Sequence, residues 1–120
     1  IHSNYASTKP TTQEQIDEYE ILLEKLKSND TTNGRSYAHI LNSLGYYYYS
    51  LDQKETSKKY FDEYIKAYPG SNSYDSMGEF YYYEKDYENS LKSYKKSLEY
   101  YSQSLSGNEK VKELESLLKK

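Results

Sequence analysis

The amino-acid sequence predicts an all-α protein, arranged as an α-α superhelix of two helix pairs with an N-terminal helix and a C-terminal capping helix. A repeat carries this prediction: the unit that spans residues 38–70 recurs, without a gap, from residue 71. Apolar residues within each unit recur at intervals of three and four, which is the helical period. Because 120 residues suit a single core, we assign residues 12–120 to one helical domain.

Tyrosine takes the place of many aliphatic core residues. The chain has 18 tyrosines but only 2 phenylalanines, and hydrophobic residues make up 35% of it. Such a polar composition usually indicates disorder, yet the net charge is only −3, and tyrosine rings bury large apolar areas when their hydroxyls find partners. We therefore expect a folded core built partly from tyrosine.

The first helix is predicted to begin at a capping box. Residues 1–11 are polar and are expected to form a flexible lead-in. Thr11 and Glu14 then have capping-box spacing, and the turn-rich segment 29–34 predicts that the helix ends near Ser28. The apolar stripe of this helix is expected to contain Ile16, Tyr19, Leu22, Leu23 and Leu26.

Each repeat is predicted to hold two helices joined by a short turn. Gly45 and Gly78 occupy the same place inside the first helix of each pair, although glycine costs about 1 kcal/mol there relative to alanine. We interpret both as close helix crossings that exclude a β-carbon, with Ser57 and Ser90 as the small residues facing them. The expected helices span about 36–51, 54–68, 73–84 and 86–104.

A last helix is predicted over residues 108–120, after Ser106-Gly107-Asn108. A stack of repeats leaves an apolar face in water at its end, and a terminal amphipathic helix would cap that face. The apolar side of this helix is expected to carry Val111, Leu114, Leu117 and Leu118.

The two repeats, residues 38–70 and 71–104, resemble the tetratricopeptide repeat. The motif of that family is large–x2–Leu–Gly–x2–Tyr, followed in the second half by a small residue, an aromatic residue and proline. The second repeat has Ser102 where the proline would fall, so its second helix is expected to run long. The matching residues are Leu41, Leu44, Gly45, Tyr48, Ser57, Phe61 and Pro69 in the first repeat, and Tyr74, Met77, Gly78, Tyr81, Ser90 and Tyr94 in the second.

The resemblance implies a non-enzymatic module that binds a protein or peptide in a concave groove lined by the first helix of each pair. Its aromatic walls and acidic floor would suit a neutral or basic segment, whereas Asp75 and Glu79 would repel a C-terminal carboxylate. An ordinary hydrated helix face is the alternative interpretation. By position, the groove residues are His39, Asn42, Tyr46, Tyr49, Asn72, Asp75, Glu79 and Tyr82.

The run of tyrosines from residue 46 to 49 covers more than half of a helix circumference, at about 100° per residue, so these rings cannot all face one core. Tyrosine is enriched at interaction hot spots, and a homodimer or docking onto another domain is therefore an expected use of the remaining rings. Drift of the composition toward tyrosine is the alternative explanation.

A narrower resemblance concerns residues 42–46, 67–79 and 94–99. These stretches look like the C-terminal tetratricopeptide segment of some secreted bacterial serine hydrolases of the β-lactamase-related type. That resemblance implies an accessory or oligomerisation domain and favours a periplasmic or secreted location over the cytoplasm. The chain opens on Ile1 rather than Met, so we expect a product processed or excised from a larger protein.

Several classes of function are not expected. The chain has no cysteine, which excludes disulfides, thiolate metal sites and cysteine nucleophiles. His2 and His39 lie far apart, and no catalytic motif such as G-x-S-x-G or H-E-x-x-H occurs, so we expect no metal site, no cofactor and no catalytic residue. Without a basic stripe or an apolar run of about 18 residues, neither nucleic-acid binding nor membrane insertion is expected.

Overall fold

The computed structural model describes residues 11–120, so most of the expected lead-in lies outside the described residues. Within this range the chain forms six α-helices and one short 3₁₀ helix, η1, and no strand, which confirms the all-α prediction. The elements are α2 (Thr12–Ser28), η1 (Arg35–Tyr37), α3 (Ala38–Ser50), α4 (Lys54–Ala67), α5 (Ser71–Tyr83), α6 (Tyr87–Tyr100) and α7 (Leu105–Leu118).

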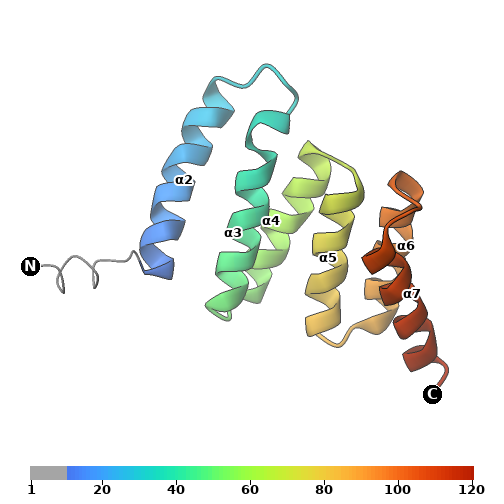
Figure 1. The fold of residues 1–120 in the computed structure, drawn as a ribbon. Helices are drawn as coiled ribbons and strands as arrows, with labels where there is room; N and C mark the ends of the chain where they lie inside the picture. Colours follow the sequence, from blue (N-terminus) through green and yellow to red (C-terminus); the bar gives the residue numbers. More distant parts are fainter. Residues whose placement is uncertain (1–10) are drawn as a thin grey trace, which may run out of the picture.

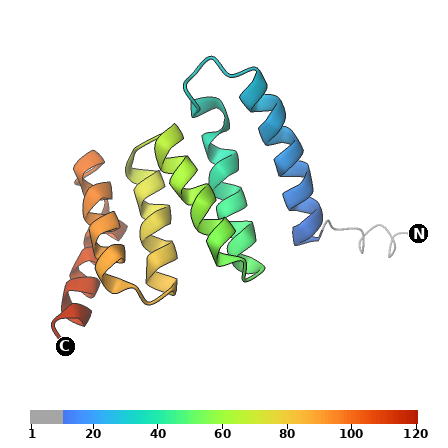
Figure 2. The same cartoon turned by 180° about the vertical axis from the view of Figure 1, so that it is seen from behind.

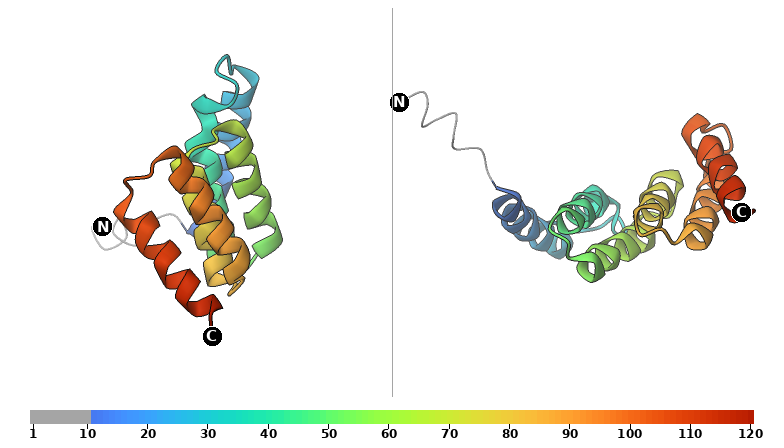
Figure 3. Two further views of the ribbon diagram at one scale, coloured as in Figure 1. Left: turned by 90° about the vertical axis from the view of Figure 1, so that its right-hand side faces the viewer. Right: turned by 90° about the horizontal axis from the view of Figure 1, so that it is seen from below.

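The helices follow one another in a zigzag row, each running roughly antiparallel to its predecessor (Figures 1 and 2). Seen from below, the row is curved, with α3 and α5 on one side and α4 on the other (Figure 3). The most extensive contacts join α3 to α4 and α5 to α6, and α6 also contacts α7 extensively. The domain is elongated, with extents of 55 × 38 × 26 Å, and the helix pairs have the expected superhelical arrangement.

The core has an aliphatic part and an aromatic part. The aliphatic part joins α2, α3 and α4, whereas the aromatic part lies around Phe61, Met77 and Phe80, between α4 and α5. Tyr64 and Tyr94 are buried, which confirms that tyrosine contributes to the core. The buried residues of the aliphatic part are Ile16, Leu23, Ala38, Ile40, Leu41, Leu44 and Tyr64.

The two glycines that recur in the repeats, Gly45 and Gly78, lie at close crossings, as their repetition predicts. A β-carbon on Gly45 would lie 2.5 Å from the Phe61 ring, and one on Gly78 would lie 2.8 Å from the Tyr94 ring. The Ser57 hydroxyl donates a hydrogen bond of 2.6 Å to the Gly45 carbonyl, and Ser90 makes the corresponding bond to Gly78 at 2.8 Å. Each crossing thus combines a ring in contact with the glycine and a serine that binds its carbonyl.

The capping box at the start of α2 is present: the Thr11 hydroxyl accepts from the Glu14 amide, and the Glu14 carboxylate accepts from the Thr11 amide. The predicted apolar stripe is wrong at Leu22, which is 39% exposed. The backbone of α2 lies close to α3 and η1, while α4 reaches it through the side chains of Tyr60 and Glu63. The covered strip is narrow, and Ile16 and Leu23 occupy its centre.

The boundary between α6 and α7 differs from the prediction. The prediction that α6 runs long, to residue 104, is wrong, because α6 ends at Tyr100. The Ser104 hydroxyl accepts a hydrogen bond from the Gly107 amide at 3.1 Å, and this N-cap starts α7 at Leu105 rather than at Asn108. The segment expected to be a turn before the last helix is therefore its first turn.

Candidate functional site

Five of the eight predicted groove residues line one cavity of about 270 Å³ between α3, α5 and α7, which we call the acidic pocket. Residues one turn apart share a helix face, and this spacing brings Asn42 and Tyr46 together on α3 and Asp75 and Glu79 together on α5. The complete lining is Asn42, Tyr46, Tyr64, Asn72, Asp75, Ser76, Glu79, Tyr94, Ser106 and Lys110.

Hydrogen bonds across this pocket hold α3 against α5. The Ser76 hydroxyl on α5 donates to the Asn42 side-chain oxygen on α3 at 2.7 Å. The Tyr46 hydroxyl donates to Ser76 at 3.5 Å, a longer contact. Asp75 accepts a bond of 2.6 Å from the Ser97 hydroxyl on α6, so the pocket wall is connected to three helices.

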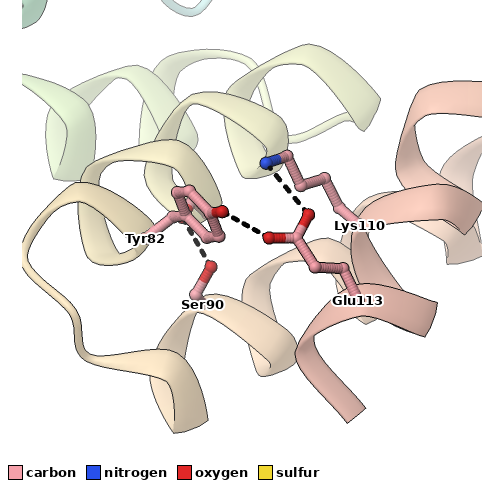
Figure 4. Close-up of polar contacts among 5 residues, drawn as sticks. Tyr82, Ser90, Lys110 and Glu113 are labelled. Carbon is pink, nitrogen blue, oxygen red and sulfur yellow. Dashed lines mark hydrogen bonds and ion pairs between the residues drawn. The ribbon is translucent and has the colours of Figure 1, made fainter. Parts of the chain in front are cut away.

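Lys110, the basic residue that lines the acidic pocket, forms its ion pair with Glu113 rather than with Asp75 or Glu79. Lys110 on α7 places its ammonium 3.7 Å from the centre of the Tyr82 ring and 3.4 Å from a carboxylate oxygen of Glu113 (Figure 4). Tyr82 in turn donates a hydrogen bond to Glu113. Because Lys110 already has an aromatic and an acidic partner, the negative charge of the acidic pocket comes from Asp75 and Glu79.

The phenols of the acidic pocket remain protonated far above neutral pH. Burial is the main cause that raises the pKa of Tyr46 to about 12; the Ser76 hydrogen bond opposes this rise and the Glu79 carboxylate contributes to it. Burial also raises the pKa of Tyr94, to which Glu79 and Asp75 add. At neutral pH the pocket therefore combines neutral hydrogen-bonding phenols with carboxylates that carry the charge.

A second cavity, of about 300 Å³, is lined only by aromatic residues, and we call it the aromatic pocket. Phe61 and Phe80 are buried in it, whereas Tyr83 is 59% exposed. Tyr46 lines both pockets and connects them. The complete lining is Tyr46, Tyr49, Phe61, Phe80 and Tyr83, from α3, α4 and α5.

The remaining predicted residues lie elsewhere. Tyr49 lines the aromatic pocket, His39 is exposed near the start of α3, and Tyr82 faces α7; neither His39 nor Tyr82 lines the two pockets. Phe80 and Tyr83 were not predicted as site residues, although they lie one turn apart in the second tyrosine-rich run. Ser106 and Lys110 could not be predicted from the sequence, because nothing local shows where α7 docks.

The described part of the chain shows neither a metal-ligand cluster nor a membrane span. In residues 11–120, no group of three or more His, Asp or Glu side chains converges as a bound metal ion would require. None of the helices described is both long enough and apolar enough to span a bilayer.

Comparison with known protein families gives two matches to one family model, described as the tetratricopeptide repeat. The matches cover residues 38–71 and 71–104, which together exceed half of the 120 residues. They coincide with the helix pairs α3–α4 and α5–α6. No curated protein gives a significant match to the chain.

Proposed function

The chain belongs to the tetratricopeptide-repeat family, and from that premise we propose that residues 12–120 form one domain that holds a neutral or basic segment of a partner protein against α3, α5 and α7. Tetratricopeptide repeats are generally protein–protein interaction modules and are typically non-enzymatic.

The acidic pocket is the observation that carries the proposal. Its cavity of about 270 Å³ contains two half-buried carboxylates, Asp75 and Glu79, while the nearby Lys110 is engaged by Glu113 and Tyr82. A concave site with carboxylates that are not neutralised favours a lysine or arginine side chain, and complementary charge also favours specific association.

Polar side chains around the carboxylates suit a peptide backbone. Asn72 is exposed at the start of α5, and its amide offers both donors and an acceptor, as peptide groups require. Asn42 on α3 lines the same cavity and is oriented by its hydrogen bond from Ser76. These amides support binding of an extended segment rather than of a lone cation.

Selection from a phage-displayed library of random linear peptides tests the proposal. We expect the chain to enrich peptides with a positive net charge, because Asp75 and Glu79 give the acidic pocket a negative electrostatic potential. The variant Asp75→Lys with Glu79→Lys reverses that potential and should no longer retain the enriched phage. Helicity by circular dichroism should stay at the level of the unsubstituted chain.

Two further variants separate the effect of charge within the acidic pocket from the effect of the net charge of the chain. Glu18→Lys with Glu24→Lys makes the same change in net charge on exposed positions of α2 and should retain the enriched peptides. Asp75→Asn with Glu79→Gln keeps the side-chain shapes and should weaken retention without reversing charge. If no peptide is enriched, or if the α2 variant loses the peptides equally, the proposed function is wrong.

A further inference from the structure

We infer that the partner segment carries a large apolar side chain two or three residues away from its lysine or arginine, and that the two side chains fill the aromatic pocket and the acidic pocket together. The inference rests on the proposed function and adds the identity and spacing of the recognised residues. Its basis is the aromatic pocket, which the fold leaves open beside the acidic one.

The aromatic pocket is built like an anchor site for an apolar side chain. Phe61, 1% exposed, and Phe80, 7% exposed, are its most deeply buried residues, and three tyrosine rings complete the wall. An open cavity of about 300 Å³ lined by rings is hydrated at an energetic cost. Transfer of one leucine-sized or phenylalanine-sized side chain into it removes that cost, as at interaction hot spots.

Contacts within the protein hold the walls of this pocket in place before any partner binds. The Tyr46 ring meets Phe61 edge-to-face at 5.0 Å, and the Tyr49 ring meets Phe80 in the same way at 5.6 Å. The Tyr49 hydroxyl donates a bond of 2.7 Å to Glu84. Since these rings are already ordered, little side-chain entropy is lost when the pocket is filled.

The charges at the rim restrict where the basic residue of the partner can bind. Glu84 on the aromatic side accepts from Tyr49 and forms an ion pair of 3.1 Å with Lys54. Its charge is therefore balanced, unlike those of Asp75 and Glu79. The partner therefore matches both sites when its apolar residue lies at the aromatic pocket and its cation at the acidic pocket.

The separation of the pockets determines the expected spacing. On α5 the acidic pocket is lined from Asn72 to Glu79, and the aromatic pocket by Phe80 and Tyr83. A helix rises about 1.5 Å per residue, so the centres of the two sets lie roughly 9 Å apart along α5. An extended peptide advances about 3.3 Å per residue, which corresponds to two or three residues.

The peptides enriched from the random library supply the first test. We expect them to share a large apolar residue and a lysine or arginine at that spacing, in either order. Fluorescence polarisation with one such peptide should show that Tyr83→Ala and Glu79→Gln each weaken binding about fivefold or more. Tyr101→Ala, at a tyrosine that is 55% exposed and lines neither pocket, is the matched control and should leave affinity unchanged.

Double-mutant cycles supply the second test. Tyr83→Ala should lose its effect when the apolar residue of the peptide is replaced by alanine, and Glu79→Gln should lose its effect when the basic residue is replaced by glutamine. The crossed combinations are Tyr83→Ala with the peptide that lacks the basic residue and Glu79→Gln with the peptide that lacks the apolar residue. In these, the two losses of binding free energy should be additive. This pattern assigns each peptide residue to one pocket, which a merely destabilised variant would not reproduce.

The outcomes separate this inference from the proposed function. Enriched basic peptides that lack an apolar residue, or that are insensitive to Tyr83→Ala, would leave the proposed function standing and overturn the inference. An enriched motif that matches a segment of this chain, together with a dimer in light scattering, would assign the pockets to a second copy and also overturn it. Failure to enrich any peptide would refute both.

Discussion

The glycine within α3 illustrates how a single residue controls the approach of two helices. Gly45→Ala would place a methyl group 2.5 Å from the ring of Phe61, which is 1% exposed and packs against the Tyr46 ring, so either the ring or the helix must shift. Overpacking of this kind costs about 1–3 kcal/mol, against a gain of about 1 kcal/mol in helix propensity. The net expectation is a fall of up to about 2 kcal/mol in the free energy of unfolding in urea.

Gly70→Ala is the control for that prediction. A β-carbon at Gly70 would come no closer than 3.9 Å to any neighbouring side chain, the Tyr68 ring being nearest, and the extended backbone there accepts any residue. Its unfolding free energy should change by less than about 0.5 kcal/mol. A rise of about 1 kcal/mol in the unfolding free energy of Gly45→Ala, as helix propensity alone would give, would contradict the close crossing.

Asp30 stabilises the loop before α3 in a pH-dependent way. Hydrogen bonds from Ser36 and Thr32, and from the Gly34 amide, lower the pKa of Asp30 to about 2 from its usual 3.8. Because the folded-state pKa lies below the unfolded one, this contribution is present above about pH 4 and is lost as pH falls toward 2. Asp30→Asn should therefore lower the thermal midpoint at pH 7.

The pH dependence distinguishes that effect from a general loss of contacts. The difference in thermal midpoint between Asp30→Asn and the unsubstituted chain should shrink as pH falls from 4 to 2. A difference that stays constant over this range would show that the ionised carboxylate is not what stabilises the loop.

At the scale of the elements, α7 depends on one buried side chain. Leu114 is fully buried, whereas Leu118 on the same helix is 41% exposed. Leu114→Ala should lower the free energy of unfolding by about 2–4 kcal/mol through the cavity it leaves, and Leu118→Ala by about 0.5 kcal/mol or less. Chemical denaturation followed by circular dichroism measures both.

The attachment of α7 also affects the acidic pocket, because Ser106 and Lys110 form part of its wall. Native-state hydrogen exchange should show that Leu114→Ala opens α7 more than it opens α3. Uniform loss of protection along the chain would mean instead that α7 unfolds only together with the rest of the stack.

For the whole molecule, tyrosine hydroxyls limit stability at high pH. Burial and, to a smaller extent, hydrogen bonds to Glu20 and to Glu84 raise the pKa of Tyr48 and of Tyr49, respectively, to about 12 each. A folded-state pKa above the unfolded value of about 10 contributes stability that is present below pH 10 and is lost as pH rises through 12. We expect cooperative unfolding in this interval.

Ultraviolet absorbance of the phenolate and circular dichroism, recorded on the same samples, check the alkaline transition. Ionisation of these buried tyrosines should coincide with loss of helicity. Glu20→Gln removes the carboxylate that binds both Tyr48 and Tyr60, so its transition should begin at lower pH. Complete ionisation with intact helices would contradict a structural role for these hydroxyls.

Much of the architecture is predictable because helical periodicity is local. The spacing of Thr11 and Glu14 predicts the start of α2, and the recurrence of Gly45 at Gly78 predicts two equivalent crossings. Boundaries were less predictable: Ser104 caps α7 through a single hydroxyl, and nothing in its neighbourhood distinguishes it from the other serines nearby. Homodimer formation and a periplasmic or secreted location stay predictions.

The candidate site was likewise predictable from the sequence only in part. Asn42, Tyr46, Asp75 and Glu79 could be assigned to one face from the sequence, because residues three or four apart on a helix project to the same side. Three features emerged only in the folded structure: the contribution of Lys110 to the acidic pocket, the contact of Tyr82 with α7, and the formation of the open aromatic pocket. A repeat pattern specifies which side chains share a helix face, but which distant helix covers that face depends on contacts between segments that the pattern does not relate.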